Sequence, residues 1–254
     1  MQRTAVVTGA ASGIGQRTVE RLIEEGWSVW ALDLSVETLA EHAKKLNVGA
    51  RLQVQKCDVS KPESVRAAFA AVAGKATKVD ALICSAGVIR IGSLEESTPE
   101  DVDLMLGVNL KGPWLCAREA LPLLRKDSTT TDPARVVIVG SIGGIRPKVG
   151  TGFYAASKAA LHVIAGILAV ELAPGGVVVN VVAPGTVATP MVEALSKTNT
   201  TSAYKPSGES PLGRIAQPDD VVDVIKFFLS DAAKYVNGTV LAVDGGTRAA
   251  FVKR

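Results

Sequence analysis

"TAVVTGAASGIG", residues Thr4–Gly15, joins a short apolar run to a glycine-rich turn and then to the start of a segment with helical periodicity. Gly9, Gly13 and Gly15 give the turn the spacing G-x-x-x-G-x-G. Glycines here permit a tight turn and let backbone N–H groups approach a pyrophosphate, while the next helix adds the positive end of its dipole. A glycine-rich turn is a weak signal alone, but its position between a first strand and a first helix predicts dinucleotide binding.

The alternation of strand and helix continues along the chain. Apolar, β-branched runs separated by amphipathic segments begin at Thr4, Ser28, Arg51, Asp80, Arg135, Gly176 and Thr239. Near-continuous apolar strands are typical of a sheet buried on both faces, and the alternation predicts parallel strands with helices on both faces. We therefore expect residues 1–254 to form one α/β domain, a Rossmann-type doubly wound parallel sheet of about seven strands.

Composition and charge exclude several other classes. The net charge of +3 is small and the basic residues are scattered, so we expect no nucleic-acid partner. Charges interrupt the apolar runs, and the chain opens directly on a strand, so we expect neither a membrane span nor a signal peptide. Three dispersed cysteines favour a reducing, cytoplasmic location, and two isolated histidines predict no metal site.

Asp33, at the end of the second predicted strand, lies close to the distance expected for a carboxylate that binds the ribose hydroxyls of NAD. The same carboxylate would repel a ribose 2′-phosphate, and no Lys or Arg stands in the glycine turn or directly after Asp33. These features favour NAD over NADP. An alternative is that Asp33 only helps to cap the next helix, a role that Ser35 would fill equally well.

"YAASK", Tyr154–Lys158, places a phenol and an ammonium at i and i+4, which are neighbours on one face of a helix. This pair is useful where a tyrosine must gain or lose a proton near neutral pH. Free tyrosine has a pKa of about 10, so a working value near 7 requires about 4 kcal/mol. A methyltransferase that uses S-adenosylmethionine also has a glycine turn and a later acidic residue, but it needs no such pair.

Further motifs follow in order along almost the whole chain, and with these the sequence resembles the short-chain dehydrogenase/reductase family. The resemblance rests on "TGAASGIG" (Thr8–Gly15), "CDV" (Cys57–Val59), "CSAG" (Cys84–Gly87), "VNL" (Val108–Leu110), "VGSIGG" (Val139–Gly144), "YAASK" (Tyr154–Lys158), "APGTVATP" (Ala183–Pro190) and "VDGG" (Val243–Gly246). Each motif is modest alone, but their order and spacing together are highly specific.

The resemblance implies the catalytic residues Asn109, Ser141, Tyr154 and Lys158. Tyr154 would be the general acid for carbonyl reduction and the base for alcohol oxidation. Lys158 and the positive nicotinamide of NAD+ would favour the phenolate. Ser141 would hydrogen-bond the substrate oxygen where charge develops, and Asn109 resembles the family residue that holds a water linking the lysine to solvent.

The resemblance also implies cofactor contacts. Asp58 would meet adenine, Ala86 and Gly87 the adenosine ribose, and the segment around Pro184 the nicotinamide amide. The full predicted set is Gly9, Ser12, Gly13, Ile14, Gly15, Asp33, Asp58, Val59, Ala86, Gly87, Tyr154, Lys158, Pro184, Gly185, Val187 and Thr189.

Cys84 and Ser85 depart from the family pattern, which usually has two asparagines there. The first asparagine often tethers the central sheet, so a cysteine loses those amide hydrogen bonds. A buried cysteine at a strand end is the more common case than a reactive thiol.

The stretch 186–214 is polar, contains Gly and Pro, and shows no clear period. Because it follows a strand end of the predicted sheet, we expect a mobile substrate lid, with a disordered surface loop as the alternative. We expect Gly143 and Gly144 to leave space near the reacting carbon. Arg90 and Arg146 are candidates for meeting an anionic substrate, although exposed arginines are usually solvated.

The sequence thus predicts an enzyme that interconverts a small-molecule secondary alcohol and a ketone with NAD(H). The alternatives are a dinucleotide-binding sensor without catalysis and an NADP(H)-dependent carbonyl or 3-oxoacyl reductase. A sugar-nucleotide epimerase is disfavoured, since such enzymes usually have another glycine spacing and a longer C-terminal substrate domain. The resemblance also implies a homotetramer that packs through helices around 106–124 and 154–173.

Overall fold

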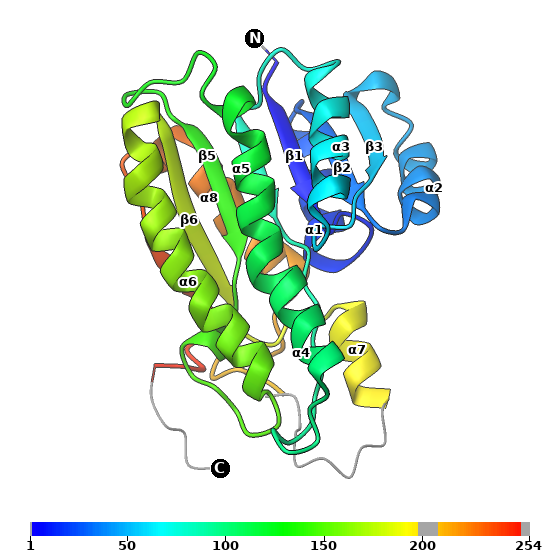
Figure 1. The fold of residues 1–254 in the computed structure, drawn as a ribbon, viewed down its shortest axis with the longest axis vertical. Coiled ribbons are helices and arrows are strands. Elements are labelled where there is room, and N and C mark those ends of the chain that lie inside the picture. Colours follow the sequence, from blue (N-terminus) through cyan, green and yellow to red (C-terminus); the bar gives the residue numbers. More distant parts are fainter. Residues whose placement is uncertain (1, 198–207, 250–254) are drawn as a thin grey trace.

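A computed structural model describes residues 2–197 and 208–249, and it has the predicted α/β architecture (Figure 1). One sheet contains seven parallel strands in the order β3-β2-β1-β4-β5-β6-β7. The strands are β1 (Thr4–Thr8), β2 (Ser28–Asp33), β3 (Leu52–Lys56), β4 (Ala81–Cys84), β5 (Ala134–Val139), β6 (Val177–Pro184) and β7 (Val240–Val243). The prediction of a Rossmann-type, doubly wound sheet is confirmed.

Helices cover both faces of the sheet (Figure 1). One face is covered by α3 (Pro62–Ala73), α5 (Gly112–Leu124) and α6 (Gly152–Leu172), and the other by α1 (Gly13–Glu24), α2 (Val36–Leu46) and α8 (Pro218–Leu229). Two shorter helices, α4 (Pro99–Leu106) and α7 (Pro190–Lys197), lie beyond the carboxyl ends of the strands.

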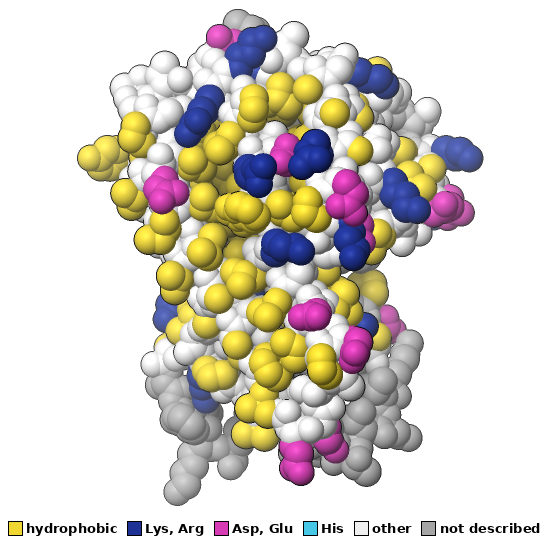
Figure 2. All heavy atoms as spheres, in the orientation of Figure 1, with side chains coloured by type: hydrophobic (Ala, Val, Ile, Leu, Met, Phe, Trp, Pro, Cys, Tyr) yellow, Lys and Arg dark blue, Asp and Glu magenta, His cyan; other side chains and the backbone are white. Residues whose placement is uncertain are grey.

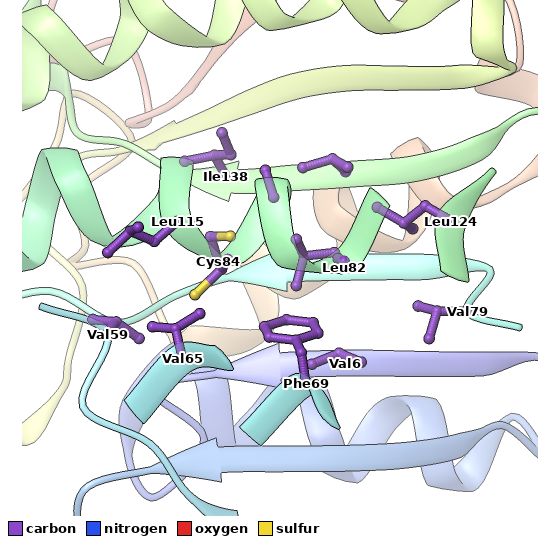
Figure 3. Packing of buried hydrophobic residues seen from close by; sticks show 14 of the residues in the cluster. Val6, Val59, Val65, Phe69, Val79, Leu82, Cys84, Leu115, Leu124 and Ile138 are labelled. Atoms are coloured by element: carbon purple, nitrogen blue, oxygen red, sulfur yellow. The ribbon is translucent and has the colours of Figure 1, made fainter. Parts of the chain in front are cut away.

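The strands are apolar throughout because each contributes to two cores. In β1, Val6 packs on the α3, α5 and α6 side, whereas Ala5 and Val7 pack on the α1 and α8 side. Figure 3 shows Val6 near Phe69 of α3 in the first of these cores. This two-sided burial explains why the strands show no polar alternation.

The strand order reverses at β1, which pairs with β2 on one side and with β4 on the other. The connections from these strands therefore leave in opposite directions and open a crevice at their carboxyl ends. The glycine-rich turn follows β1 directly, and Cys84 ends β4 at the same edge. The fold thus brings the predicted motifs to one edge of the sheet.

Three details differ from the sequence-based expectations. Arg51 does not begin β3, because it ends a short 3-10 helix over Gly49–Arg51. The stretch 186–214 is not structureless in its described part: Pro190–Lys197 form α7, and Val187 makes a parallel bridge to Ala216. Residues 198–207, the centre of the predicted lid, lie outside the described residues.

The third difference concerns apolar length. The stretch Gly152–Gly175, α6 with the turn that follows it, is long and apolar enough to cross a membrane by length and composition alone. The expectation that charges keep every apolar run shorter than a membrane span was therefore wrong for this stretch. One face of α6 packs on the sheet through Leu161, Ala165 and Ala169. A helix in a protein core can be as long and as apolar as a membrane-spanning helix.

Candidate active site

A cavity of about 450 Å³ opens at the carboxyl edge of the sheet, across the point where the strand order reverses. It is lined by residues from the glycine-rich turn, from the ends of β2 to β6 and from α6 and α7. The predicted site residues among them are Gly9, Ser12, Gly13, Ile14, Asp33, Asp58, Val59, Ala86, Gly87, Ser141, Tyr154, Lys158, Pro184, Gly185, Val187 and Thr189. Gly15 and Asn109 do not line it.

The glycine-rich turn has a geometry that other residues would not allow. Gly9 has a positive φ of 66°, and a Cβ on it would lie 2.6 Å from the backbone of Ala86 after β4. A Cβ on Gly15 would lie only 2.1 Å from the carbonyl oxygen of Gly9. Gly15 therefore serves the close packing of α1 on the turn, rather than forming part of the cavity wall.

The N-terminus of α1 faces the same cavity through Gly13 and Ile14. Its first turn contains no acidic side chain, and Ser12 at the N-cap makes no side-chain capping bond. Free N–H groups and the positive end of a helix dipole suit a phosphate. Thr189 packs against this turn, because a Cβ on Gly13 would lie 3.1 Å from Cγ2 of Thr189. The turn therefore fits a pyrophosphate.

Asp33 ends β2 at the cavity, and its carboxylate holds two backbone groups. Oδ2 accepts a hydrogen bond from Ala11 N at 3.0 Å, and Oδ1 accepts one from Ser35 N at 3.0 Å. Ser35 is the N-cap of α2 without a side-chain capping bond, so Asp33 both lines the cavity and supports the helix start. Among the described residues that line the cavity, Lys158 alone has a basic side chain.

Asp58 is the residue that the family resemblance places beside adenine. Its hydrogen bonds are to residues that follow it closely in the sequence. Its Oδ1 accepts hydrogen bonds from Ser60 N at 2.9 Å and Ser60 Oγ at 2.7 Å. Its own N–H donates to Ser64 Oγ at 2.9 Å. These bonds fix the turn between β3 and α3, and so fix this wall of the cavity.

Tyr154 and Lys158 share one face of α6, as their spacing predicts. Lys158 is 4% exposed, and its Nζ donates to the carbonyl of Val139 at 3.0 Å and lies 6.0 Å from the Tyr154 ring centroid. Burial lowers the pKa of Lys158 from 10.5 to about 8. The lysine is therefore held between β5 and the tyrosine.

Ser141 lies beside Tyr154. A Cβ on Gly143 would lie 3.2 Å from Ser141 Oγ and 3.4 Å from Tyr154 Cε1, so these two side chains flank one point. Ser141 Oγ accepts a hydrogen bond from Gly143 N at 3.0 Å. Gly144 differs from the expectation, because a Cβ there would lie 2.7 Å from the Lys158 carbonyl carbon. Gly144 allows close packing on α6 and leaves no space for a substrate.

Asn109 is fully buried in a π-helical turn over Gly107–Lys111, between α4 and α5. Its amide holds both backbone groups of Val88: Oδ1 accepts from Val88 N at 2.8 Å, and Nδ2 donates to Val88 O at 2.8 Å. Nδ2 also donates to Ser157 Oγ at 3.1 Å, and Ser157 Oγ donates to the carbonyl of Tyr154 at 2.7 Å. Asn109 thus joins the segment after β4 to the helix that carries Tyr154.

Ser157 was missed by reasoning from the sequence, although it stands inside "YAASK". The available signal was its position three residues after Tyr154, which places a small polar side chain on the same side of the helix. The cavity residues Leu104, Val108, Met191 and Val192 were also missed, because their apolar side chains carry no chemical signature.

Cys84 is buried in the core under α5, beside Val65 and Leu115 (Figure 3). Its thiol donates a weak hydrogen bond to the carbonyl of Pro113 at 3.9 Å. A hydrogen bond with Cys84, and then burial, raise the pKa of Cys116 well above its usual range. The cysteine in place of asparagine therefore ties β4 to α5 through sulfur contacts.

Two arginines were candidates for anion binding. Arg90 pairs with Asp101 at 3.0 Å, and Arg146 donates to the carbonyl of Thr247. Both guanidinium groups thus have protein partners. Within the described ranges, no three His, Cys, Asp or Glu side chains are grouped so that they could hold a metal ion.

The model of the protein family described as enoyl-(acyl carrier protein) reductase matches residues 9–248. The chain is 34% identical over 245 residues to the 3-oxoacyl-(acyl-carrier-protein) reductase FabG of Thermotoga maritima, covering 96% of this chain and 97% of that protein.

Solved structures agree over the same length. The 3-ketoacyl-(acyl-carrier-protein) reductase of Brucella melitensis complexed with NADH has a TM-score of 0.84 at 28% identity, covering 96% of this chain and 98% of that one. Levodione reductase has a TM-score of 0.89 at 29% identity, covering 98% of both chains.

Proposed function

Because the chain belongs to the short-chain dehydrogenase/reductase family of oxidoreductases, we propose that it interconverts a secondary alcohol and a ketone with NAD(H), using Tyr154 as general acid and base. The observation that carries this proposal is the meeting of Ser141, Tyr154 and the buried Lys158 in one cavity with the glycine-rich turn and Asp33. When bound there, the nicotinamide accepts or supplies the hydride.

The residues of this chain supply the proton and hold the reacting oxygen. In the reductive direction, Tyr154 donates its phenolic proton to the carbonyl oxygen of the substrate. Ser141 donates a hydrogen bond to that oxygen as its negative charge develops. Lys158, whose ammonium form is adjacent to the tyrosine, favours the phenolate that remains. Asn109 and Ser157 hold the backbone around these groups in place.

We propose NAD as the cofactor, because Asp33 presents a carboxylate to the cavity. Of the described residues that line this cavity, only Lys158 has a basic side chain. A ribose 2′-phosphate beside Asp33 would meet like charge without a compensating cation. Asp33→Asn removes the charge and keeps a carbonyl oxygen for Ala11 N, although it gives up the acceptor for Ser35 N. The ratio of kcat/KM for NAD+ to that for NADP+ should exceed about tenfold in wild type and fall clearly in this variant.

The test of the reaction follows NADH absorbance while a panel of secondary alcohols is offered with NAD+ or NADP+. Wild type and Tyr154→Phe are compared side by side. Turnover that disappears in the variant, while NADH still binds, supports the proposed role. Turnover that survives unchanged in Tyr154→Phe contradicts it, and a protein that binds NADH without turnover on any compound would favour a dinucleotide sensor.

A second candidate is the reduction of a 3-oxoacyl thioester. Two of the similar proteins carry names of 3-oxoacyl- or 3-ketoacyl-(acyl-carrier-protein) reductases. Reduction of acetoacetyl-CoA, measured with NADH and with NADPH, tests this candidate. A kcat/KM above that for all simple ketones would favour it.

We also propose a homotetramer in which copies pack through α5 and α6. Side chains of α6 that face away from the sheet are apolar and exposed, including Val163, Ile167 and Val170. Figure 2 shows that hydrophobic side chains are frequent on this face of the molecule.

A cytoplasmic location stays a prediction from the sequence.

A further inference from the structure

His162 lies one helical turn after Lys158 and two turns after Tyr154, on the same face of α6. Its Nε2 is buried and has no hydrogen-bond partner among the described residues. Burial, and then the charge of Lys158, lower the pKa of His162 from 6.5 to about 4. The imidazole is therefore neutral at neutral pH and adds no second positive charge beside Lys158.

The imidazole packs against both ends of the loop that carries Ser141. A Cβ on Gly140 would lie 2.6 Å from His162 Nε2, and a Cβ on Gly144 would lie 2.9 Å from His162 Cε1. One edge of the ring thus contacts the residue directly before Ser141 and the residue that ends the short 3-10 helix Ile142–Gly144. A side chain at Gly140 would meet the ring first, and one at Gly144 would meet both the ring and the backbone of α6.

The same face of α6 holds this loop a second time. Lys158 Nζ donates to the carbonyl of Val139, which is the last residue of β5 and the residue before Gly140. The position of Ser141 is therefore set from α6 by a hydrogen bond at Val139 and by the His162 ring at Gly140 and Gly144. Tyr154 stands on that same helix face, so the helix can fix the spacing between the two hydroxyl groups.

We propose that His162 is a positioning residue, which holds Ser141 at the correct distance from Tyr154 by filling the space between Gly140 and Gly144. This inference rests on the proposed function, since it assigns a role for that reaction. His162 does not line the cavity, so we expect its removal to take away no direct contact with the cofactor. Its loss acts on the chemical step rather than on dinucleotide binding.

The test compares His162→Ala with His42→Ala, the same change at the other histidine of the chain. His42 stands on α2, bonded to Glu20 at 2.9 Å, and takes no part in the cavity. In His162→Ala, kcat should fall by about tenfold to a hundredfold, because a small displacement of a reacting group has effects of that size. The KM for NAD+ and the Kd for NADH should stay within about twofold of wild type.

Added imidazole supplies a readout that general destabilisation would not produce. Free imidazole can enter the space left in His162→Ala, and it should restore part of kcat there without changing His42→Ala or wild type. A crystal structure of His162→Ala should show Ser141 displaced from its place beside Tyr154. This second measurement does not depend on finding the substrate.

A kcat of His162→Ala equal to that of wild type, or a crystal structure with Ser141 unmoved, would overturn the positioning role. An equal loss of kcat and of NADH affinity, without rescue by imidazole, would also overturn it and show only structural damage. Tyr154→Phe, measured in parallel, separates the two proposals. If Tyr154→Phe remains active, the proposed reaction fails; if it is inactive while His162→Ala is unaffected, only the positioning role fails.

Discussion

Ser141 receives a hydrogen bond from the N–H of Gly143, and this bond decides what its own proton can do. Because Oγ already accepts from the backbone, the hydroxyl proton is directed away and can be donated to a substrate oxygen. Ser141→Ala removes that donor and should lower kcat by about a hundredfold to a thousandfold. Ser141→Thr keeps the hydroxyl and serves as control. Steady-state kinetics that show no loss for Ser141→Ala would contradict the role.

Gly143 lies against both Ser141 and Tyr154, so its missing side chain leaves space at the point where the substrate oxygen would bind. A methyl group there should obstruct large ketones more than small ones. In Gly143→Ala, kcat/KM should fall by at least about tenfold for bulky ketones and much less for acetone-sized ones. Gly74→Ala at the C-terminus of α3 is the matched control, since its Cβ would meet its nearest neighbours at ordinary distances of 3.5 Å and 3.6 Å. Equal losses for all substrate sizes would argue against this steric role.

Lys158 links pH to stability, because burial lowers its pKa from 10.5 to about 8 in the folded state. Between these values the unfolded chain binds a proton that the folded chain does not, so stability rises with pH across this window. The unfolding free energy of wild type, relative to Lys158→Met, should increase by up to about 3 kcal/mol from pH 8 to 10.5.

The measurement is urea unfolding without cofactor, at one protein concentration. Lys45→Met, at an exposed position on α2, is the control. The difference between its unfolding free energy and that of wild type should not change with pH. If the difference in unfolding free energy between wild type and Lys158→Met is also independent of pH, the buried ammonium is not destabilised.

At the level of elements, β4 and α5 contact each other through the side chains of Cys84 and Cys116. The related family usually has an asparagine amide at the position of Cys84. Burial raises the pKa of Cys57 to about 12, and Cys116 and Cys84 are equally buried. Thiols of this kind are inert. We expect none of the three to react with Ellman's reagent at pH 8 in the native protein, and all three to react in urea. Rapid labelling of one thiol in the native protein would identify an exposed state of this core.

The strands and the order of motifs could be predicted from the sequence because they follow from patterns of local burial. Runs such as "TAVVT" and "GVVVNVV" are apolar on both faces, and both form strands of the sheet. Tyr154 and Lys158 could be paired because helical spacing alone brings them together. These signals are contained in a few consecutive residues.

Features that depend on distant residues could not be predicted. The π-helical turn at Asn109 exists together with side-chain bonds to Val88, which is far away in the sequence. Helix α7 is only eight residues long and precedes a polar stretch, so its period is too short to be recognised. The contact of His162 with Gly140 and Gly144 likewise arises only when α6 packs beside β5.

The exposed apolar face of α6 is a property of the whole molecule. Val163, Ile167 and Val170 are 66%, 53% and 74% exposed, and a group of exposed apolar side chains on one helix is typical of a protein–protein contact. Ile167→Lys should weaken association and reduce the mass measured by multi-angle light scattering below that of a tetramer. Thr130→Lys, on the exposed loop after α5, should leave the mass unchanged. A wild-type protein that is a stable monomer at micromolar concentration would contradict the proposal.

The central place of β1 in the sheet has a consequence for how the chain acquires its structure. β1 pairs with β2, which follows it after a single helix, but its other neighbour, β4, follows only after two further helices and a strand. Such non-local pairing closes a long loop and is slow. Gly9 and Ala86, which face one another across this junction, are brought together only then. On the ribosome, the nucleotide pocket therefore cannot exist until β4 has emerged and docked, and a nascent chain truncated before it has no complete pocket.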